Sequence, residues 1–489
     1  MASFNSRQIK STSMTEPPSL PETRDEESAS AWWNPWHWPA GMWALAIGLI
    51  VAAVPFGIRL VMLAGVPAMP EPFDVDEFVR WDVPAEHDAF TEYRRAEELR
   101  TQLAADLLAR AVKEPENSSD VIQKGWAEAD EQLKQWLEMH REALIVWRQG
   151  TEKQRGLLQS PSHVNIESTL EAVQGLRAFG RLAVYEEARL IAAGQLDEAR
   201  QWAHAAYRCG GHVSHRGCVI QGQVAVALHA MSTGGLARWA EQPAVTGEQL
   251  MAALAATKSD YRLYESRSNI LKSEYLAFRH LLLLTGMMGS GDPEETAPSA
   301  IVAVTKMGFW VVGEPELTLR VDRQILANQI REIDKPVAAR RPVAGAGVAL
   351  LFDSDPAVPL LSGQLDVGGI DRGIQRAFMI RARLPVLIQV DRALLRQDAR
   401  QLVFEVLLAA QAHRRDHGEF PENLAQLVPR FLPSVPLDPF DPAAGPLRYR
   451  RDDALKAVVW SVGDDGIDGG GNVVAPENAR PTDVGMELK

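Results

Sequence analysis

The sequence predicts a mainly α-helical protein with a single transmembrane helix, an irregular or repeat-like α-helical domain and a small C-terminal α+β domain. Three observations support this: an uncharged apolar run at 40–58, helical spacing of apolar residues from about 86 to 287, and two short strand patterns near the C-terminus. The chain has 489 residues, 46% of them hydrophobic, which suits a folded protein of two to four structural units.

Charge and cysteine content exclude several classes of function. The net charge is −13, from 51 Lys and Arg against 64 Asp and Glu. Binding to nucleic acid needs a basic surface, so we expect no nucleic-acid partner. Two cysteines cannot build a disulfide-rich scaffold. Common nucleotide, serine-hydrolase and zinc-protease motifs are missing from the sequence, so we expect a protein that is not an enzyme.

Residues 40–62 are expected to form the transmembrane helix. About 20 apolar residues are needed to cross the hydrocarbon core, and the run from 40 to 58 contains no charge. Arg59 could reach the membrane interface near the end of the span. Tryptophan favours the headgroup level. Five tryptophans gather at the start of the span: Trp32, Trp33, Trp36, Trp38 and Trp43.

The regions on either side of the span favour a retained membrane helix over a cleaved signal peptide or a buried core helix. Residues 1–39 are rich in Ser, Pro, Thr and Glu and are expected to be a disordered tail. Such a tail is too long for the charged region of a signal peptide. Residues 63–84, rich in Pro and Asp, are expected to be a linker. The charges around the span do not determine its orientation.

Residues 85–290 are expected to form the α-helical domain. Within it, the stretch AAGQLDEARQWAHAAYR is similar to a tetratricopeptide-type helix pair, with small residues around a glycine turn. No repeat of 34 residues is sustained through the region. Two interpretations therefore remain: an irregular helical domain, or a repeat scaffold with a groove for a peptide or protein partner.

The two cysteines lie in a C-x2-H-x2-H-x2-C pattern. Its members are Cys209, His212, His215 and Cys218. All four are zinc-ligand types, but ten residues leave little chain to wrap a tetrahedral site. A disulfide across a glycine-rich turn is a second interpretation, if the compartment is oxidising. Two small, unpaired core residues are the third.

Residues 291–394 are expected to be a mixed connecting region with one helix at 314–334. The glycines of this region lack the strand–turn–helix context of a nucleotide-binding loop. We therefore assign no site to it.

The C-terminal residues 395–475 are expected to form the α+β domain, followed by a flexible tail at 476–489. A helix with an apolar stripe is expected at 395–417. The segments LRYRR and AVVWSV are expected to be two short strands that form a hairpin. The loop after the second strand holds Asp464, Asp465 and Asp468 within five residues. Oxygen ligands of this kind suit Ca2+, although the spacing is not that of an EF-hand.

The order of motifs in this region resembles the globular domain of the major pseudopilin of bacterial type II secretion. The matching pieces are DHGEFP at 416–421, L-x-x-L at 424–427, DPF at 438–440, Tyr449 in a strand, and SVGDDGIDGG at 461–470. The resemblance covers about one sixth of the chain. It implies a structural calcium site at Ser461, Asp465 and Asp468, with Asp464 as a further candidate.

The resemblance also implies a location and a class of function. The family's globular domain lies in the periplasm, so we expect a single-pass protein of the bacterial inner membrane with a cytoplasmic N-terminus. The family's leader sequence and its membrane-embedded helix half do not match this chain. We therefore expect an anchored scaffold or accessory protein, associated with a secretion or pilus-like system. A helical-repeat binding module with the C-terminal domain as a cap is the alternative, and the oligomeric state stays open.

Overall fold

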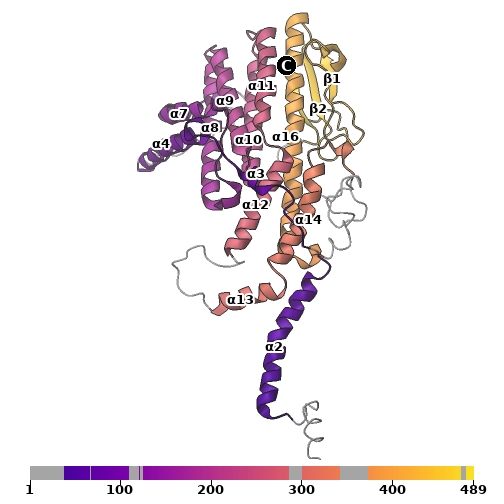
Figure 1. Cartoon of the computed structure of the whole chain (residues 1–489). Coiled ribbons are helices and arrows are strands. Elements are labelled where there is room, and N and C mark those ends of the chain that lie inside the picture. Colours follow the sequence, from indigo (N-terminus) through magenta and orange to yellow (C-terminus); the bar gives the residue numbers. More distant parts are fainter. Residues whose placement is uncertain are drawn as a thin grey trace, which may run out of the picture. The chain divides into compact units, whose positions relative to one another are not determined.

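The computed structural model confirms a mainly helical chain with one small sheet (Figure 1). It describes residues 38–66, 68–109, 121, 125–285, 300–341, 373–474 and 481–489. The chain forms two compact units, Met1–Val61 and Met62–Lys489. The expected tail, except Trp38 and Pro39, and much of the connecting region lie outside the described residues.

Helix α2 covers Ala40–Leu63, and all of it except the last two residues belongs to the first unit. At 24 residues α2 is about 36 Å long, enough to cross a bilayer. None of its residues is buried by protein. Among the described residues, α2 is the one helix long and apolar enough to span a membrane. This confirms the candidate membrane helix in its coarse form.

The second unit begins with a succession of helices. Their bounds are α3 Val75–Val79, α4 Ala89–Ala109, α6 Glu131–Met139, α7 Arg141–Thr151, α8 Ile166–Ala192, α9 Leu196–Ser214, α10 Val219–Glu241, α11 Gly247–Asp260, α12 Arg267–Thr285, α13 Ala300–Val311, α14 Glu316–Glu332 and α16 Phe378–His417. Short 3-10 turns lie at 85–87, 126–128, 161–163, 261–263, 337–339 and 424–427. The helix expected at 314–334 is α14.

Local sequence signals explain several helix ends. Asp130 accepts a hydrogen bond from the backbone N–H of Leu133 at 2.7 Å and starts α6. Thr246 and Gln249 form a capping box at the start of α11. Gly418, with φ of +83°, ends α16 in the left-handed conformation that glycine adopts without a steric penalty.

One hydrophobic core joins the helical region to the C-terminal domain. It extends from Phe90 and Trp147 in the early helices through Phe404 of α16 to Leu488 near the C-terminus. Helices α10 and α11 pack against one side of α16, while β2 and β3 pack against the same helix (Figure 1). The C-terminal domain therefore shares its core with the helical region.

A second core lies around α12, α14 and the first half of α16. It includes Tyr275, Leu317, Val321 and Leu387, and Val66 joins it from the segment that follows α2. Helix α16 is continuous over 40 residues, so it starts well before the boundary expected at 395. One long helix thus contributes to both cores.

The sheet has three antiparallel strands in the order β1-β2-β3. Strands β1 and β2, at Arg448–Asp453 and Lys456–Ser461, form the expected hairpin. The third strand, β3 at Val484–Leu488, lies where a flexible tail was expected at 476–489. That expectation was wrong for 484–488, because Leu488 pairs with Ala457 and is buried against α16.

Two buried histidines give the fold a predictable sensitivity to acid. Burial, aided by the nearby Arg208 charge, lowers the pKa of His212 to about 3, and burial lowers the pKa of His229 to about 3. An unfolded histidine titrates near 6.5. Each therefore contributes stability that is complete above pH of about 6.5 and is lost as the pH falls toward 3, by about 1.4 kcal/mol per pH unit.

We expect the variant His229→Phe to reduce the pH dependence of the free energy of unfolding. Between about pH 6.5 and 4 its free energy of unfolding should fall with pH less steeply than that of the wild type, by about 1.4 kcal/mol per pH unit. Denaturant unfolding at a series of pH values measures the slope. His87→Phe, at an exposed position, is the matched control. Equal slopes for His229→Phe and the wild type would contradict the prediction.

Candidate functional site

The end of α2 and the segment that follows it are held by four arginines, here called the arginine collar: Arg279, Arg320, Arg323 and Arg376. Arg376 Nη1 donates to the carbonyl oxygens of Met62 and Ala64 at 3.2 and 3.1 Å. Arg320 donates to Val66 and Arg323 to Met69, each at 3.0 Å.

The carboxylate of Glu71 binds two arginines of the collar. It accepts from Arg279 at 2.6 Å, from Arg323 at 2.8 Å and from the Tyr275 hydroxyl at 2.6 Å. Burial would raise the pKa of Glu71, but the Tyr275 hydrogen bond and the two arginine charges outweigh it and hold the pKa below its usual value. Within the expected linker at 63–84, the residues Ala64, Val66, Met69 and Glu71 are therefore bonded to α12, α14 and the turn before α16.

The predicted membrane-interface residues fall partly in the described region. Trp38 and Trp43 have ring centroids 5.6 Å apart at the start of α2, and Arg59 lies within this helix. Trp32, Trp33 and Trp36 lie outside the described residues.

The predicted calcium residues each face a different protein partner. Asp464 pairs with Arg396 at 2.7 Å, and Asp465 accepts from the backbone N–H of Ile467 at 3.0 Å. Asp468 accepts from Trp460 Nε1 at 2.9 Å, and the buried Ser461 hydroxyl donates to Asp438 at 2.6 Å. The backbone N–H of Gly470 and the Trp460 hydrogen bond lower the pKa of Asp468.

These oxygens do not converge in the arrangement observed. Over the described residues, no group of three or more His, Cys, Asp and Glu side chains is placed to hold a metal ion. The calcium site therefore stays a prediction from the family resemblance.

Two carboxylates that were not among the predicted site residues organise the glycine-rich loop. Asp483, fully buried, accepts from the backbone N–H groups of Gly469, Gly471 and Asn472 at 3.0, 2.9 and 2.8 Å. Asp438 accepts from the Val462 N–H at 2.8 Å and from Ser461. The loop backbone is thus shaped by carboxylates from neighbouring segments.

The cysteine and histidine pattern does not form one site. Cys209 and Cys218 are free, buried thiols, and burial raises the pKa of the Cys209 thiol to about 12. His212 Nδ1 lies 2.8 Å from the Tyr93 hydroxyl, whereas His215 Nδ1 lies 3.2 Å from Glu265. His215 and Cys218 flank the α9–α10 turn, at the C-cap of α9 and the N-cap of α10.

A groove of about 480 Å³ lies between α4 and α8. Its apolar lining consists of Phe90, Tyr93, Leu158, Ala172 and Leu176, and its polar lining of Arg94, Glu97, Glu98, Thr101 and Gln102. Glu97 is held in a two-point ion pair with Arg100, at 2.6 and 2.8 Å. The groove combines an apolar floor with a charged rim, as protein-binding surfaces do.

A second cavity, here called the tyrosine cleft, has a volume of about 320 Å³ and lies where the chain turns between α11 and α12. Its lining residues are Tyr261, Tyr264, Glu265, Ser266, Arg267, Asp334, Leu394, Gln397 and Asp398. The Tyr261 and Tyr264 rings stack with centroids 5.3 Å apart. Tyr261 donates to Asp398 at 2.5 Å.

Charged groups converge on the tyrosine cleft. Arg267 Nη1 lies 3.7 Å from Asp398 Oδ2 and 4.0 Å from Asp391 Oδ1, and it makes no hydrogen bond. Burial raises the pKa of Asp398, and Arg267 opposes this shift. Asp398 lines the cleft, and 37% of its side chain is accessible.

The residues of the tyrosine cleft were missed in the sequence. Tyr261 and Asp398 are separated by 137 positions, and Arg267 pairs with partners from α16. The density of aromatic and charged residues in YRLYESR, at 261–267, was the available signal. No protein family, curated protein or solved structure matches this chain.

Proposed function

We propose that the protein is a membrane-anchored scaffold that holds a segment of a partner protein in the groove between α4 and α8. The groove is the observation that carries this proposal. The arginine collar supports it, because it bonds the residues that follow the membrane helix to the body of the second unit.

The lining of the groove indicates the kind of segment that would bind. Apolar side chains of the partner would contact Phe90, Leu158 and Leu176 at the floor. Glu97 is already paired with Arg100, so Glu98 and Arg94 remain as one charge of each sign on the rim. The segment would therefore carry polar or charged residues of either sign beside its apolar ones. A helical or extended peptide with this composition is the expected occupant.

Peptide selection tests the groove directly. We expect a displayed library of random peptides, selected against the full chain in lipid nanodiscs, to yield binders rich in apolar residues. The variant Ala172→Trp fills the groove and should weaken their binding at least tenfold, a loss of about 1.4 kcal/mol. Fluorescence anisotropy with a synthetic copy of each selected peptide measures the affinity.

The control for the groove is Gln174→Trp on the exposed face of the same helix, outside the groove lining. It adds the same side chain and should leave the affinity unchanged. Peptides that bind Ala172→Trp as tightly as the wild type would contradict the proposed binding to the groove. A selection that enriches no peptide would contradict it as well.

The second part of the proposal concerns location. By the pseudopilin resemblance of 395–472, we place the second unit in the periplasm and associate the protein with a secretion or pilus-like system. Leu455, in the exposed turn between β1 and β2, offers a labelling position. Both native cysteines are buried, so they give little background.

Thiol labelling tests this orientation. We expect a membrane-impermeant maleimide to label Leu455→Cys in spheroplasts whose inner membrane is intact, because the turn would face the outside. The wild-type chain, treated in the same way, reports any reaction of the buried cysteines. Labelling that occurs only after lysis would reverse the assigned topology.

A further inference from the structure

Helix α13 has an apolar sequence, and the described residues do not bury it. Its residues AIVAVTKMGFWV include one charge, Lys306, and no acidic side chain. Between 303 and 311, where the side chains are described, none is buried. Val304 and Met307 are 72% and 59% exposed. A helix that is apolar on most of its surface is normally buried in protein or in lipid.

The end of α13 lies next to the point where the chain leaves α2. Gly313 follows α13, and a Cβ at this position would lie 3.5 Å from Leu63 Cδ2 and 3.5 Å from Met62 Cβ. Met62, Leu63 and α13 all belong to the second unit. This contact is therefore internal to that unit, and it places the end of α13 beside the last residues of α2.

This neighbourhood indicates what covers α13. If α2 spans the bilayer, Met62 and Leu63 lie at the membrane surface, and the adjoining α13 lies there too. At 12 residues α13 is about 18 Å long, which is too short to cross about 30 Å of hydrocarbon. Such a helix can lie along the interface with its apolar side in the acyl chains.

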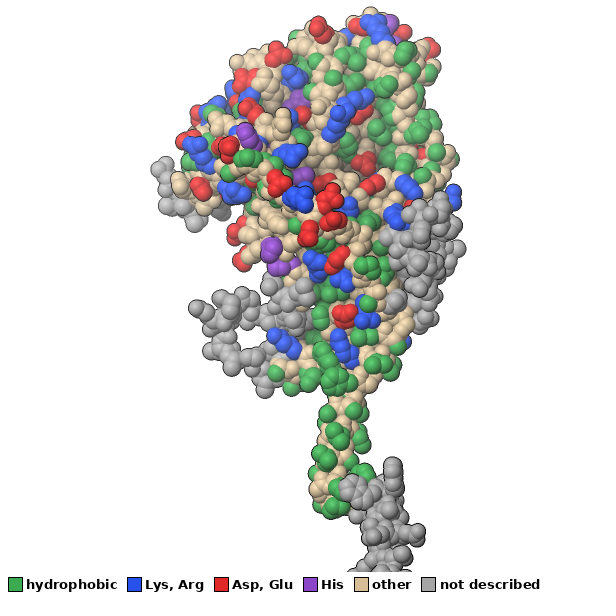
Figure 2. All heavy atoms as spheres, viewed as in Figure 1, with side chains coloured by type: hydrophobic (Ala, Val, Ile, Leu, Met, Phe, Trp, Pro, Cys, Tyr) green, Lys and Arg blue, Asp and Glu red, His purple; other side chains and the backbone are tan. Residues whose placement is uncertain are grey.

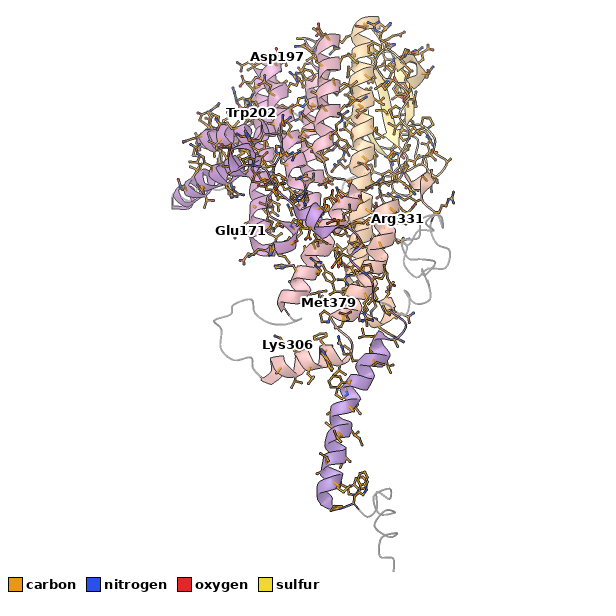
Figure 3. The ribbon with its side chains drawn as sticks, in the orientation of Figure 1. Glu171, Asp197, Trp202, Lys306, Arg331 and Met379 are labelled. Atoms are coloured by element: carbon orange, nitrogen blue, oxygen red, sulfur yellow. The ribbon has the colours of Figure 1, made fainter. Side chains whose placement is uncertain are left out.

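The spacing of apolar residues in α13 and the positive charges near it suit that position. Val304, Met307 and Val311 follow one another at intervals of three and four, so they share one side of the helix. Figure 3 labels Lys306 on this helix, whose long side chain can reach lipid phosphates. The cationic collar residues Arg320 and Arg376 bind the backbone beside Met62. In Figure 2 hydrophobic and basic side chains mingle at this end of the unit.

We propose that α13 is a second membrane contact, an interfacial helix that lies in the lipid surface beside the exit of α2. This inference rests on the proposed anchoring by α2. The occupant of the exposed α13 surface is the bilayer, with Val304 and Met307 in the acyl region and Lys306 at the headgroups. Two attachment points would restrict how the second unit tilts on the membrane.

Fluorescent labelling of the full chain in vesicles tests this directly. An environment-sensitive nitrobenzoxadiazole label is placed at Met307→Cys, in vesicles of three parts phosphatidylethanolamine to one part phosphatidylglycerol. The expected result is blue-shifted emission that lipids carrying a nitroxide on the acyl chain quench. Leu455→Cys, exposed in the β1–β2 turn, is the control that should stay in water and unquenched.

A third label separates failure of this inference from failure of the anchor. Leu49→Cys lies in the middle of α2 and should be quenched by the same lipids. Quenching at Leu49→Cys with water-like emission at Met307→Cys would overturn the α13 proposal alone. Water-like emission at both would overturn the anchor as well. Blue-shifted emission at Met307→Cys without quenching would show that protein covers α13, and would also overturn the proposal.

Discussion

Replacing Arg383 by Met lowers the free energy of unfolding by about 3–5 kcal/mol, because it leaves a buried carboxylate without its partner. Arg383 in α16 pairs with Asp322 in α14, and their side chains are 9% and 4% exposed. Burial raises the pKa of Asp322, while Arg383 opposes the shift. Denaturant unfolding of the full chain in detergent, followed by circular dichroism, measures the change.

Two further variants test the cause of this loss. Arg383→Met combined with Asp322→Leu removes both charges, so it should recover most of the stability. Arg450→Met breaks an exposed pair with Asp452, whose side chains are 49% and 43% exposed, and should cost less than about 1 kcal/mol. If Arg383→Met lowers the free energy of unfolding no more than Arg450→Met does, the Arg383–Asp322 pair is not the buried ion pair described above.

Replacing Asp483 by Ala destabilises the C-terminal domain by about 3 kcal/mol, because three backbone N–H groups lose a charged acceptor. Gly469, Gly471 and Asn472 donate these hydrogen bonds. The loss should be the same with added calcium and with a chelator, since the carboxylate itself holds the loop. Thermal unfolding of the full chain under both conditions gives the comparison.

Asp465→Ala is the control for the loop, because among the described residues Asp465 accepts one local hydrogen bond, from the backbone N–H of Ile467. We expect this variant to unfold close to the wild-type temperature. A calcium-dependent rise in the wild-type unfolding temperature that Asp465→Ala abolishes would establish the metal site implied by the pseudopilin resemblance. An unchanged Asp483→Ala protein would refute the carboxylate-held loop.

Features carried by local sequence were predictable. The α2 helix follows from an uncharged apolar run, and the β1–β2 hairpin from alternation around a short turn. Helix caps such as Thr246 with Gln249 are also local. In each case, residues within a few positions determine the structure, so one sequence contains the needed information.

Features that depend on distant partners were missed. Strand β3 has five residues, and its pairing with β2, across 23 to 31 positions, gives it stability that its own sequence does not show. Arg376 donates to the carbonyl oxygen of Met62 across 314 positions, so the bonding of this segment to the second unit could not be predicted from its own sequence. The same holds for Tyr261 and Asp398 in the tyrosine cleft, which no spacing rule connects.

The shared core around α16 has a consequence for synthesis of the chain. Helix α10 ends at Glu241, yet Val403 and Phe404 of α16, in the same core, follow about 160 residues later. At about 5–20 residues per second, a ribosome needs roughly ten to thirty seconds to make that stretch. Throughout this interval the apolar side of α10 that α16 later covers is open to water. We therefore expect the nascent helical region to need chaperones that shield its apolar surface until the last fifth of the chain has been made.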